Sequence, residues 1–96
     1  MASFTLSKTA RQDVESILAL IAAEHVETAT SFNDRLGDVF LMLADDASVG
    51  RERTELIEGI RSFEAGGYTI FYRLWAGSVA ISRVIHTSRD LDEVFG

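Results

Sequence analysis

The spacing of the apolar residues changes part-way along this 96-residue chain, and this change is the strongest constraint on the fold. Up to about residue 44 the apolar residues recur every three or four positions, which is the period of a helix with one buried face. From residue 60 to residue 86 the pattern changes to alternation and to β-branched and aromatic runs, which favours strands. Helices followed by strands are typical of an α+β fold, in which the helices pack on one face of an antiparallel sheet.

The first half of the chain predicts one short strand and two helices. Residues 2–7 alternate apolar with smaller or polar side chains, and Ser7 is placed to cap a following helix. The helices are expected over residues 8 to about 25 and about 28 to 44, and the short connection favours an antiparallel hairpin. Their apolar stripes are made by Ala10, Val14, Ile17, Leu18, Ile21 and Ala22, and by Ala29, Phe32, Leu36, Phe40 and Leu43.

The second half of the chain predicts three strands. A polar segment, residues 45–53, is expected to be a loop, and Gly66-Gly67 and residues 76–78 are expected to be turns. The strands are expected over residues 60–65, 68–75 and 79–86, and a short helical turn over residues 88–95. The predicted order is β-α-α-β-β-β, a single α+β domain over residues 1–96 with a helical hairpin packed on a mostly antiparallel sheet.

The composition excludes several kinds of site. The chain has no cysteine, so disulfides and thiolate metal sites are impossible. Its two histidines stand alone and no phosphate-binding loop or nucleophile motif is present, so we expect no metal site and no cofactor. The longest apolar run, residues 17–23, is far shorter than the roughly 20 residues that span a membrane. With no signal-peptide pattern, we expect a cytoplasmic protein with no membrane contact.

The net charge of −6 is unevenly distributed. Residues 60–89 hold four arginines and one acidic residue, a balance of +3, whereas the rest of the chain has a balance of −9. The overall sign argues against general binding of DNA or RNA, and we expect no sequence-specific nucleic-acid binding by the chain alone. The arginine-rich segment predicts a partner-binding face, with an acidic protein segment as plausible a partner as nucleic acid. The alternative is that the arginines pair with acidic residues of the chain itself.

Aromatic residues alternate with the arginines on the predicted strands. Alternation places Tyr68 and Tyr72 on one face of the sheet and Phe71 and Trp75 on the other. If the helical hairpin covers the first face, Phe71, Arg73 and Trp75 stay exposed, and this composition is typical of an interface hot spot. Stacking of nucleic-acid bases on such a sheet is the alternative, although packing within the sheet accounts for most of these aromatic residues.

The ordered set of motifs along the chain resembles the RelE/ParE toxins, and their ParE branch in particular. The similarity extends from Ser3 to Phe95. The motifs are Phe4-x-Leu6-Ser7-x-x-Ala10, Gly50-Arg51, Gly59-x-Arg61-Ser62-Phe63, Gly67-Tyr68-x-Ile70-Phe71-Tyr72-Arg73 and Arg83-Val84-Ile85-His86-x-Ser88-Arg89-Asp90. The resemblance implies the toxin of a type II toxin–antitoxin module. Such a toxin inhibits DNA gyrase by binding and forms a hetero-oligomer with the ParD-like antitoxin that neutralises it.

Relatives of the RelE type instead cut mRNA on the ribosome, which is the alternative function. That chemistry needs positive charge and an acid–base group around the scissile phosphate, and in this chain Arg89, His86 and Arg61 would supply them. Thr69 stands where such nucleases have a basic residue, and Phe95 stands where they have a tyrosine. We therefore expect no catalytic residue. A non-toxic partner-binding module is a further alternative.

The antitoxin is expected to bind along the grooves of the helical hairpin and on the exposed sheet. Its acidic side chains would meet the arginines of the positive segment. The predicted antitoxin-binding residues are Arg61, Phe71, Arg73, Trp75, Arg83 and Arg89.

Overall fold

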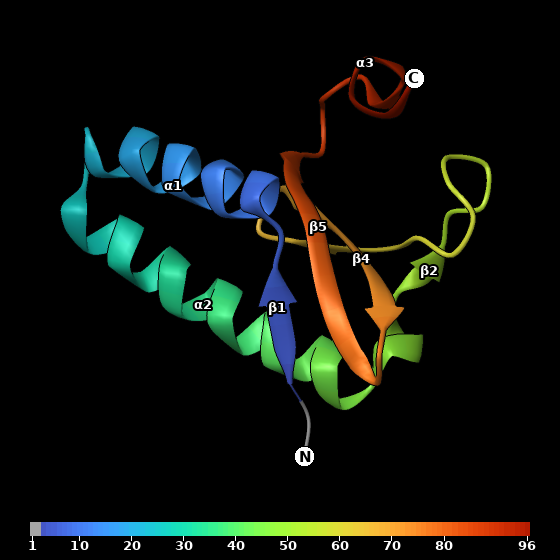
Figure 1. Ribbon diagram of the computed structural model, residues 1–96. Helices are drawn as coiled ribbons and strands as arrows, with labels where there is room; N and C mark the ends of the chain where they lie inside the picture. The colour runs from blue at the N-terminus through green and yellow to red at the C-terminus, as the bar shows by residue number, and fades with distance from the viewer. Residues whose placement is uncertain (1–2) are drawn as a thin grey trace.

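The computed structural model describes residues 3–96 and confirms the predicted order of helices and strands (Figure 1). The predicted first strand begins at Ala2, which lies outside the described residues. The N-terminal elements are β1 (Phe4–Leu6), α1 (Lys8–Ala22) and α2 (Val26–Asp45). The later elements are β3 (Arg61–Ala65), β4 (Tyr68–Trp75), β5 (Ser78–His86) and the C-terminal helix α3 (Leu91–Phe95).

The segment predicted as a loop, residues 45–53, contains two short elements. These are the 3-10 helix η1 (Ala47–Val49) and the strand β2 (Arg51–Glu52), which pairs with β3. Within residues 3–96 the sheet therefore has five strands in the order β1-β5-β4-β3-β2, and only the β1–β5 pair is parallel. A strand of two residues is too short for a recognisable alternation, so the sequence carries no signal for β2.

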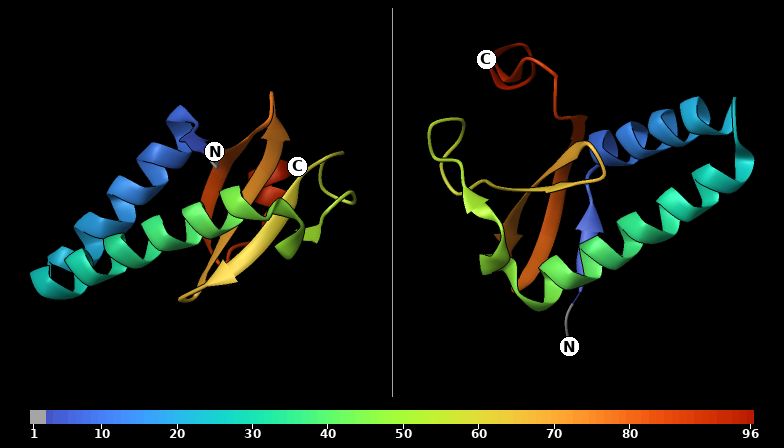
Figure 2. Two further views of the ribbon diagram at one scale, coloured as in Figure 1. Left: turned by 90° about the horizontal axis from the view of Figure 1, so that it is seen from below. Right: turned by 180° about the vertical axis from the view of Figure 1, so that it is seen from behind.

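The helical hairpin covers one face of the sheet and projects beyond the edge formed by β1 (Figures 1 and 2). Ser7 caps α1 as predicted, because its Oγ accepts a hydrogen bond from the Ala10 N–H at 3.0 Å. The apolar stripes of both helices pack against the covered face of the sheet. The buried residues of this core are Ala10, Leu36, Phe40, Leu43, Ile70, Tyr72, Val79, Ile81 and Val84.

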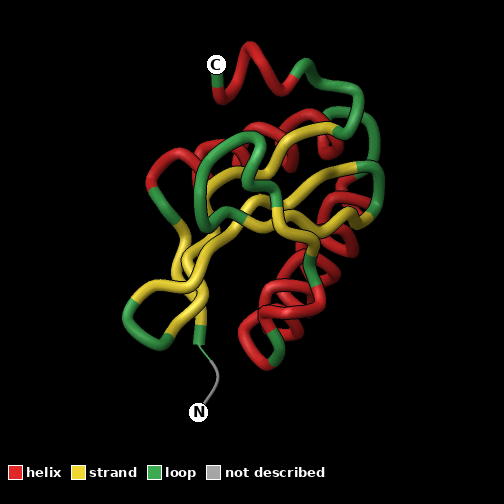
Figure 3. The backbone as a smooth tube through the Cα atoms, turned by 90° about the vertical axis from the view of Figure 1, so that its right-hand side faces the viewer, coloured by secondary structure: helices red, strands yellow, loops and turns green. Residues whose placement is uncertain are grey.

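The opposite face of the sheet carries a second, smaller core. Phe71 is fully buried there with Ile60 and Ile85. The ring of Phe95, from α3, lies edge-on to the ring of Phe71 with 4.7 Å between centroids. The prediction that Phe71 is exposed is therefore wrong, because α3 and the loop before β3 cover this part of the face. In Figure 3, α3 lies at the end of the molecule away from the N-terminus.

Tyr72 anchors the η1–β2 segment to the sheet. Its hydroxyl donates a hydrogen bond to the Ala47 carbonyl at 2.6 Å and accepts one from the Gly50 N–H at 2.9 Å. Arg61, from β3, donates to the Gly50 carbonyl at 2.8 Å. Both polar backbone groups of Gly50 are thus bound by side chains of the sheet, which sets the position of β2 beside β3.

Stability is expected to fall at high pH because of Tyr72. Burial raises the pKa of the Tyr72 phenol, since an ionised oxygen loses its hydration. A folded-state pKa above the unfolded value of about 10 means that the stabilisation is complete below about pH 10 and is lost as the pH rises through the folded pKa. Denaturant unfolding at a series of pH values across this range should show that the free energy of unfolding falls more steeply for the wild type than for Tyr72→Phe. Equal losses in the two proteins would contradict this assignment.

Candidate interaction surface

The strand β5 is longer than its neighbour at the edge of the sheet. β1 pairs only with residues 79–81, so residues 82–86 of β5 have no strand partner on this edge within the described chain. A β-bulge occurs where this free edge begins, because Phe71 is opposite Arg83 whereas Tyr72 is opposite Ile81. Bulges of this kind bend a strand and re-aim its side chains. The free edge of β5 faces α1.

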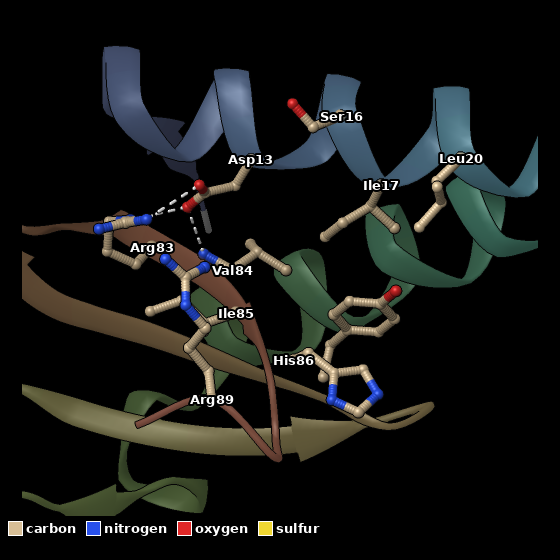
Figure 4. A pocket seen from close by; sticks show the side chains of 10 residues that line it. Asp13, Ser16, Ile17, Leu20, Arg83, Val84, Ile85, His86 and Arg89 are labelled. Carbon is tan, nitrogen blue, oxygen red and sulfur yellow. Dashed lines mark hydrogen bonds and ion pairs between the residues drawn. The ribbon is translucent and has the colours of Figure 1, made fainter. Parts of the chain in front are cut away.

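Asp13 of α1 binds this free edge through three hydrogen bonds (Figure 4). Its carboxylate accepts from Nε and Nη2 of Arg83 at 2.8 and 3.1 Å, and from the Val84 N–H at 3.0 Å. The side chains of Arg83 and Asp13 are only 25% and 16% exposed. The hydrogen bonds to Asp13 raise the pKa of Arg83, so the guanidinium stays charged. Asp13 therefore fixes α1 against β5 and satisfies one of the free edge N–H groups.

A groove of about 430 Å³ lies between α1 and this part of β5. Ile17 and Leu20 form apolar parts of its helical wall, and Leu20 is largely exposed. Arg89, in the turn after β5, is exposed and extends into the groove in Figure 4. The other lining residues are Asp13, Ser16, Tyr68, Arg83, Val84, Ile85 and His86. The groove thus combines accessible apolar side chains, a free sheet edge and a cation.

His86 is held by the turn that follows β5. The Ser88 N–H donates to Nδ1 of His86 at 3.1 Å, and Ser88 Oγ lies 2.7 Å from the same nitrogen. Because Nδ1 accepts from the Ser88 N–H, the neutral ring carries its proton on Nε2. Arg61, the third residue of the alternative nuclease set, lies on β3 and binds the Gly50 carbonyl and Glu52. The structure brings His86 and Arg89 together but places Arg61 apart from them, with β4 between.

The six residues predicted to bind the antitoxin do not form one surface. Arg83 and Arg89 line the groove. Arg73 and Trp75 lie together near the β4–β5 turn. Arg61 and Phe71 make contacts inside the fold. Arg83 and Arg61 form ion pairs within the chain, as the alternative interpretation of the arginines expects.

Sequence reasoning misses Asp13 and Leu20 but places Ile17, the other apolar residue of the helical wall, on the apolar stripe of the first helix. Asp13 carries a usable signal, because it lies three residues after Ala10 and four before Ile17, on the apolar face of α1. A carboxylate on such a face needs a partner. Leu20 carries no such signal, since its exposure follows from the projection of the hairpin beyond the sheet. Within residues 3–96, no group of three or more His, Asp or Glu is arranged to hold a metal ion, and no helix is long and apolar enough to cross a membrane.

The sheet order and the helical hairpin on one face match the fold of the RelE/ParE toxins. A chain of the chromosomal ParDE toxin–antitoxin system from P. aeruginosa superposes with a TM-score of 0.74 at 19% identity, over 90% of this chain and 96% of that one. A chain of the toxin–antitoxin complex RelBE2 from Mycobacterium tuberculosis gives a TM-score of 0.58 at 28% identity, over 88% of this chain and 96% of that one.

The model of the family described as the ParE toxin of the type II toxin–antitoxin system parDE matches residues 4–91. The chain therefore belongs to the ParE toxin family, which confirms the resemblance seen in the sequence motifs. A search of curated protein sequences finds no match.

Proposed function

We propose that this ParE-family toxin inhibits DNA gyrase by binding it and is neutralised by a ParD-like antitoxin in a hetero-oligomer. The observation that carries the antitoxin part is the groove between α1 and the free edge of β5. The two similar structures are described as toxin–antitoxin systems, which supports a partner of this kind. Gyrase as the target rests on the family membership.

The chemistry of the groove fits an acidic segment with apolar side chains. Leu20 and Ile17 offer apolar surface on one wall, and Arg89 offers a charge that forms no ion pair within the described residues. An extended segment along β5 gains backbone hydrogen bonds from the free edge, and its carboxylates gain contacts with Arg89. The proposed mode of neutralisation is therefore occupation of this groove.

Inhibition by binding is favoured over RNA cleavage by the separation of the alternative catalytic residues. Arg61 is engaged by Gly50 and Glu52, and the neutral ring of His86 accepts at Nδ1 from Ser88. A cleavage site needs its base and its cations around one phosphate. This arrangement supports a toxin that acts through its surface.

Leu20→Asp is expected to weaken antitoxin binding by about 30-fold or more, the effect of removing an interface hot spot. The new carboxylate, which the bound antitoxin would cover, would also repel an acidic segment. The matched control is Leu41→Asp, because Leu41 is also largely exposed but lies on α2 outside the groove. Titration calorimetry with purified antitoxin measures the dissociation constants of the two variants. Equal effects of the two substitutions would contradict the assignment of the groove.

The target is tested by supercoiling of relaxed plasmid with purified gyrase. The chain should block supercoiling and raise the amount of cleaved DNA, and added antitoxin should reverse both effects. A parallel translation reaction should show no codon-positioned cuts in mRNA. Cuts that disappear with Arg89→Ala, together with unaffected supercoiling, would favour the nuclease alternative.

A further inference from the structure

The β4–β5 turn exposes two large apolar side chains next to each other. Leu74 is 63% exposed and Trp75 is 67% exposed, and as neighbours on a strand they lie on opposite faces of the hairpin. Trp is the residue type most enriched in interface hot spots, because it buries a large area with few rotatable bonds. Neither core of the fold includes these two residues.

The turn that presents them is short and is hydrogen-bonded at its base. Trp75 pairs with Ser78, and the two residues between them, Ala76 and Gly77, have φ values of 51° and 77°. Alanine in this left-handed region costs about 1 kcal/mol, and such strain tends to gather at functional sites. The Ser78 hydroxyl donates to the Ser3 carbonyl at 3.2 Å, which ties the base of the turn to the chain beside β1. A rigid presentation lowers the entropy that is lost on binding.

Arg73 gives this surface a positive charge. Its guanidinium lies 5.7 Å from the centroid of the Trp75 ring, so the cation stacks on the aromatic face while both side chains remain exposed. No acidic residue occurs in the sequence between Glu64 and Asp90. Arg73 also forms no ion pair within residues 3–96, so the carboxylates that would complement it come from a partner.

The turn and the groove lie at opposite ends of the β4–β5 hairpin. Trp75 pairs with Ser78 at one end, and Tyr68 pairs with His86 at the other. At a rise of about 3.4 Å per residue, the two ends are about 24 Å apart. In Figure 1 the turn is at the lower end of β5, and α3 is at the upper end. A segment confined to the groove therefore does not reach the turn.

We propose that Arg73 and Trp75, which share one face of the hairpin, form a second docking surface, through which the toxin contacts its target protein rather than its antitoxin. The partner is a folded protein with an apolar pocket for Trp75 and carboxylates at the rim for Arg73. This inference rests on the proposed function in one respect, that the chain is a toxin with a protein target. It differs from the prediction made from the sequence, which assigns Arg73 and Trp75 to the antitoxin.

The test compares growth inhibition with antitoxin affinity for the same variants. Trp75→Ala and Arg73→Glu should each relieve growth inhibition when the toxin is expressed alone, and both should keep the affinity of the wild type for the antitoxin. Thermal unfolding should be unchanged, since both side chains are exposed. The control is Val26→Ala, a similarly exposed apolar residue at the far end of the helical hairpin, which should remain fully toxic.

Retained toxicity of Trp75→Ala would overturn the proposal, and so would a wild-type chain that leaves growth unaffected. Loss of antitoxin affinity would assign the turn to the antitoxin. The gyrase assay is a separate measurement. If the wild type stops growth but leaves supercoiling intact, the gyrase proposal fails while the docking surface is still tested by growth.

Trp75 also provides a direct probe, because it is the single tryptophan of the chain. Toxin labelled with 5-fluorotryptophan gives one ¹⁹F resonance. This resonance should not move when antitoxin is added or when the toxin is diluted. A shift with antitoxin would show that the antitoxin covers the turn, and a shift on dilution would show that a second copy of the chain does. Either shift would overturn the assignment to the target.

Discussion

Gly50→Ala is expected to destabilise the fold by about 3 kcal/mol, the combined effect of a steric overlap in a packed core and the loss of buried hydrogen bonds. A Cβ atom at Gly50 would overlap the Tyr72 hydroxyl and lie 2.7 Å from Cζ of the same ring. Tyr72 is fully buried between the helices and the sheet, so its ring has no room to retreat. Relief requires that Gly50 moves away, which breaks its bond with the hydroxyl and displaces β2.

The measurement is thermal unfolding, in which a loss of this size lowers the midpoint by about 15 °C. The matched control is Gly37→Ala, because a Cβ there has no neighbour within 4 Å. Gly37 lies inside α2, where alanine is the better helix former by about 1 kcal/mol, so the control should raise the midpoint. A Gly50→Ala protein as stable as the wild type would mean that Tyr72 does not hold this segment.

Asp13→Ala is expected to destabilise the fold by about 2 kcal/mol, less than for a fully buried ion pair because both partners keep some solvent contact. The substitution leaves the Arg83 guanidinium without its bidentate partner and the Val84 N–H without its acceptor. It also removes the polar link between α1 and the edge of β5, which the apolar contacts of α1 do not replace. The affinity of the groove for its partner should therefore fall, although Asp13 itself is satisfied within the chain.

A double-mutant cycle with Arg83→Ala separates the pair from other effects of the substitution. The coupling measured by denaturant unfolding should be about 1 kcal/mol or more, because the two residues form one hydrogen-bonded unit. Glu15→Ala is the control on the same helix, since Glu15 is exposed and forms no ion pair within residues 3–96. A coupling near zero would show that Asp13 acts only through the Val84 backbone.

The sequence predicts well the helices and strands that are long enough to show a clear pattern of apolar residues. β4 is predicted with its observed bounds, because an aromatic and β-branched run of eight residues has no competing helical interpretation. β2 is not predicted, since its position depends on Tyr72 and Arg61, which bind Gly50 from other strands. The sequence around β2 contains no trace of these contacts.

The candidate site is predicted in part. Counting charges along the chain selects Arg83 and Arg89, but it treats all the arginines as equivalent. The structure distinguishes them, because Arg83 meets an aspartate 70 residues earlier whereas Arg89 does not. Phe71 is assigned to the correct face of the sheet, yet its burial depends on Phe95, and the alternation along β4 holds no information about that contact.

The parallel pairing of β1 with β5 has a consequence for the order of events during synthesis. Phe4 pairs with Val79, so the first strand to be made waits for the last one before the sheet can close. The groove needs the same two parts of the chain, because α1 provides one wall and β5 the other. A nascent toxin therefore has no groove to offer until β5 has been translated. Any partner that recognises this site therefore has to wait for the synthesis of β5, although α1 is made much earlier.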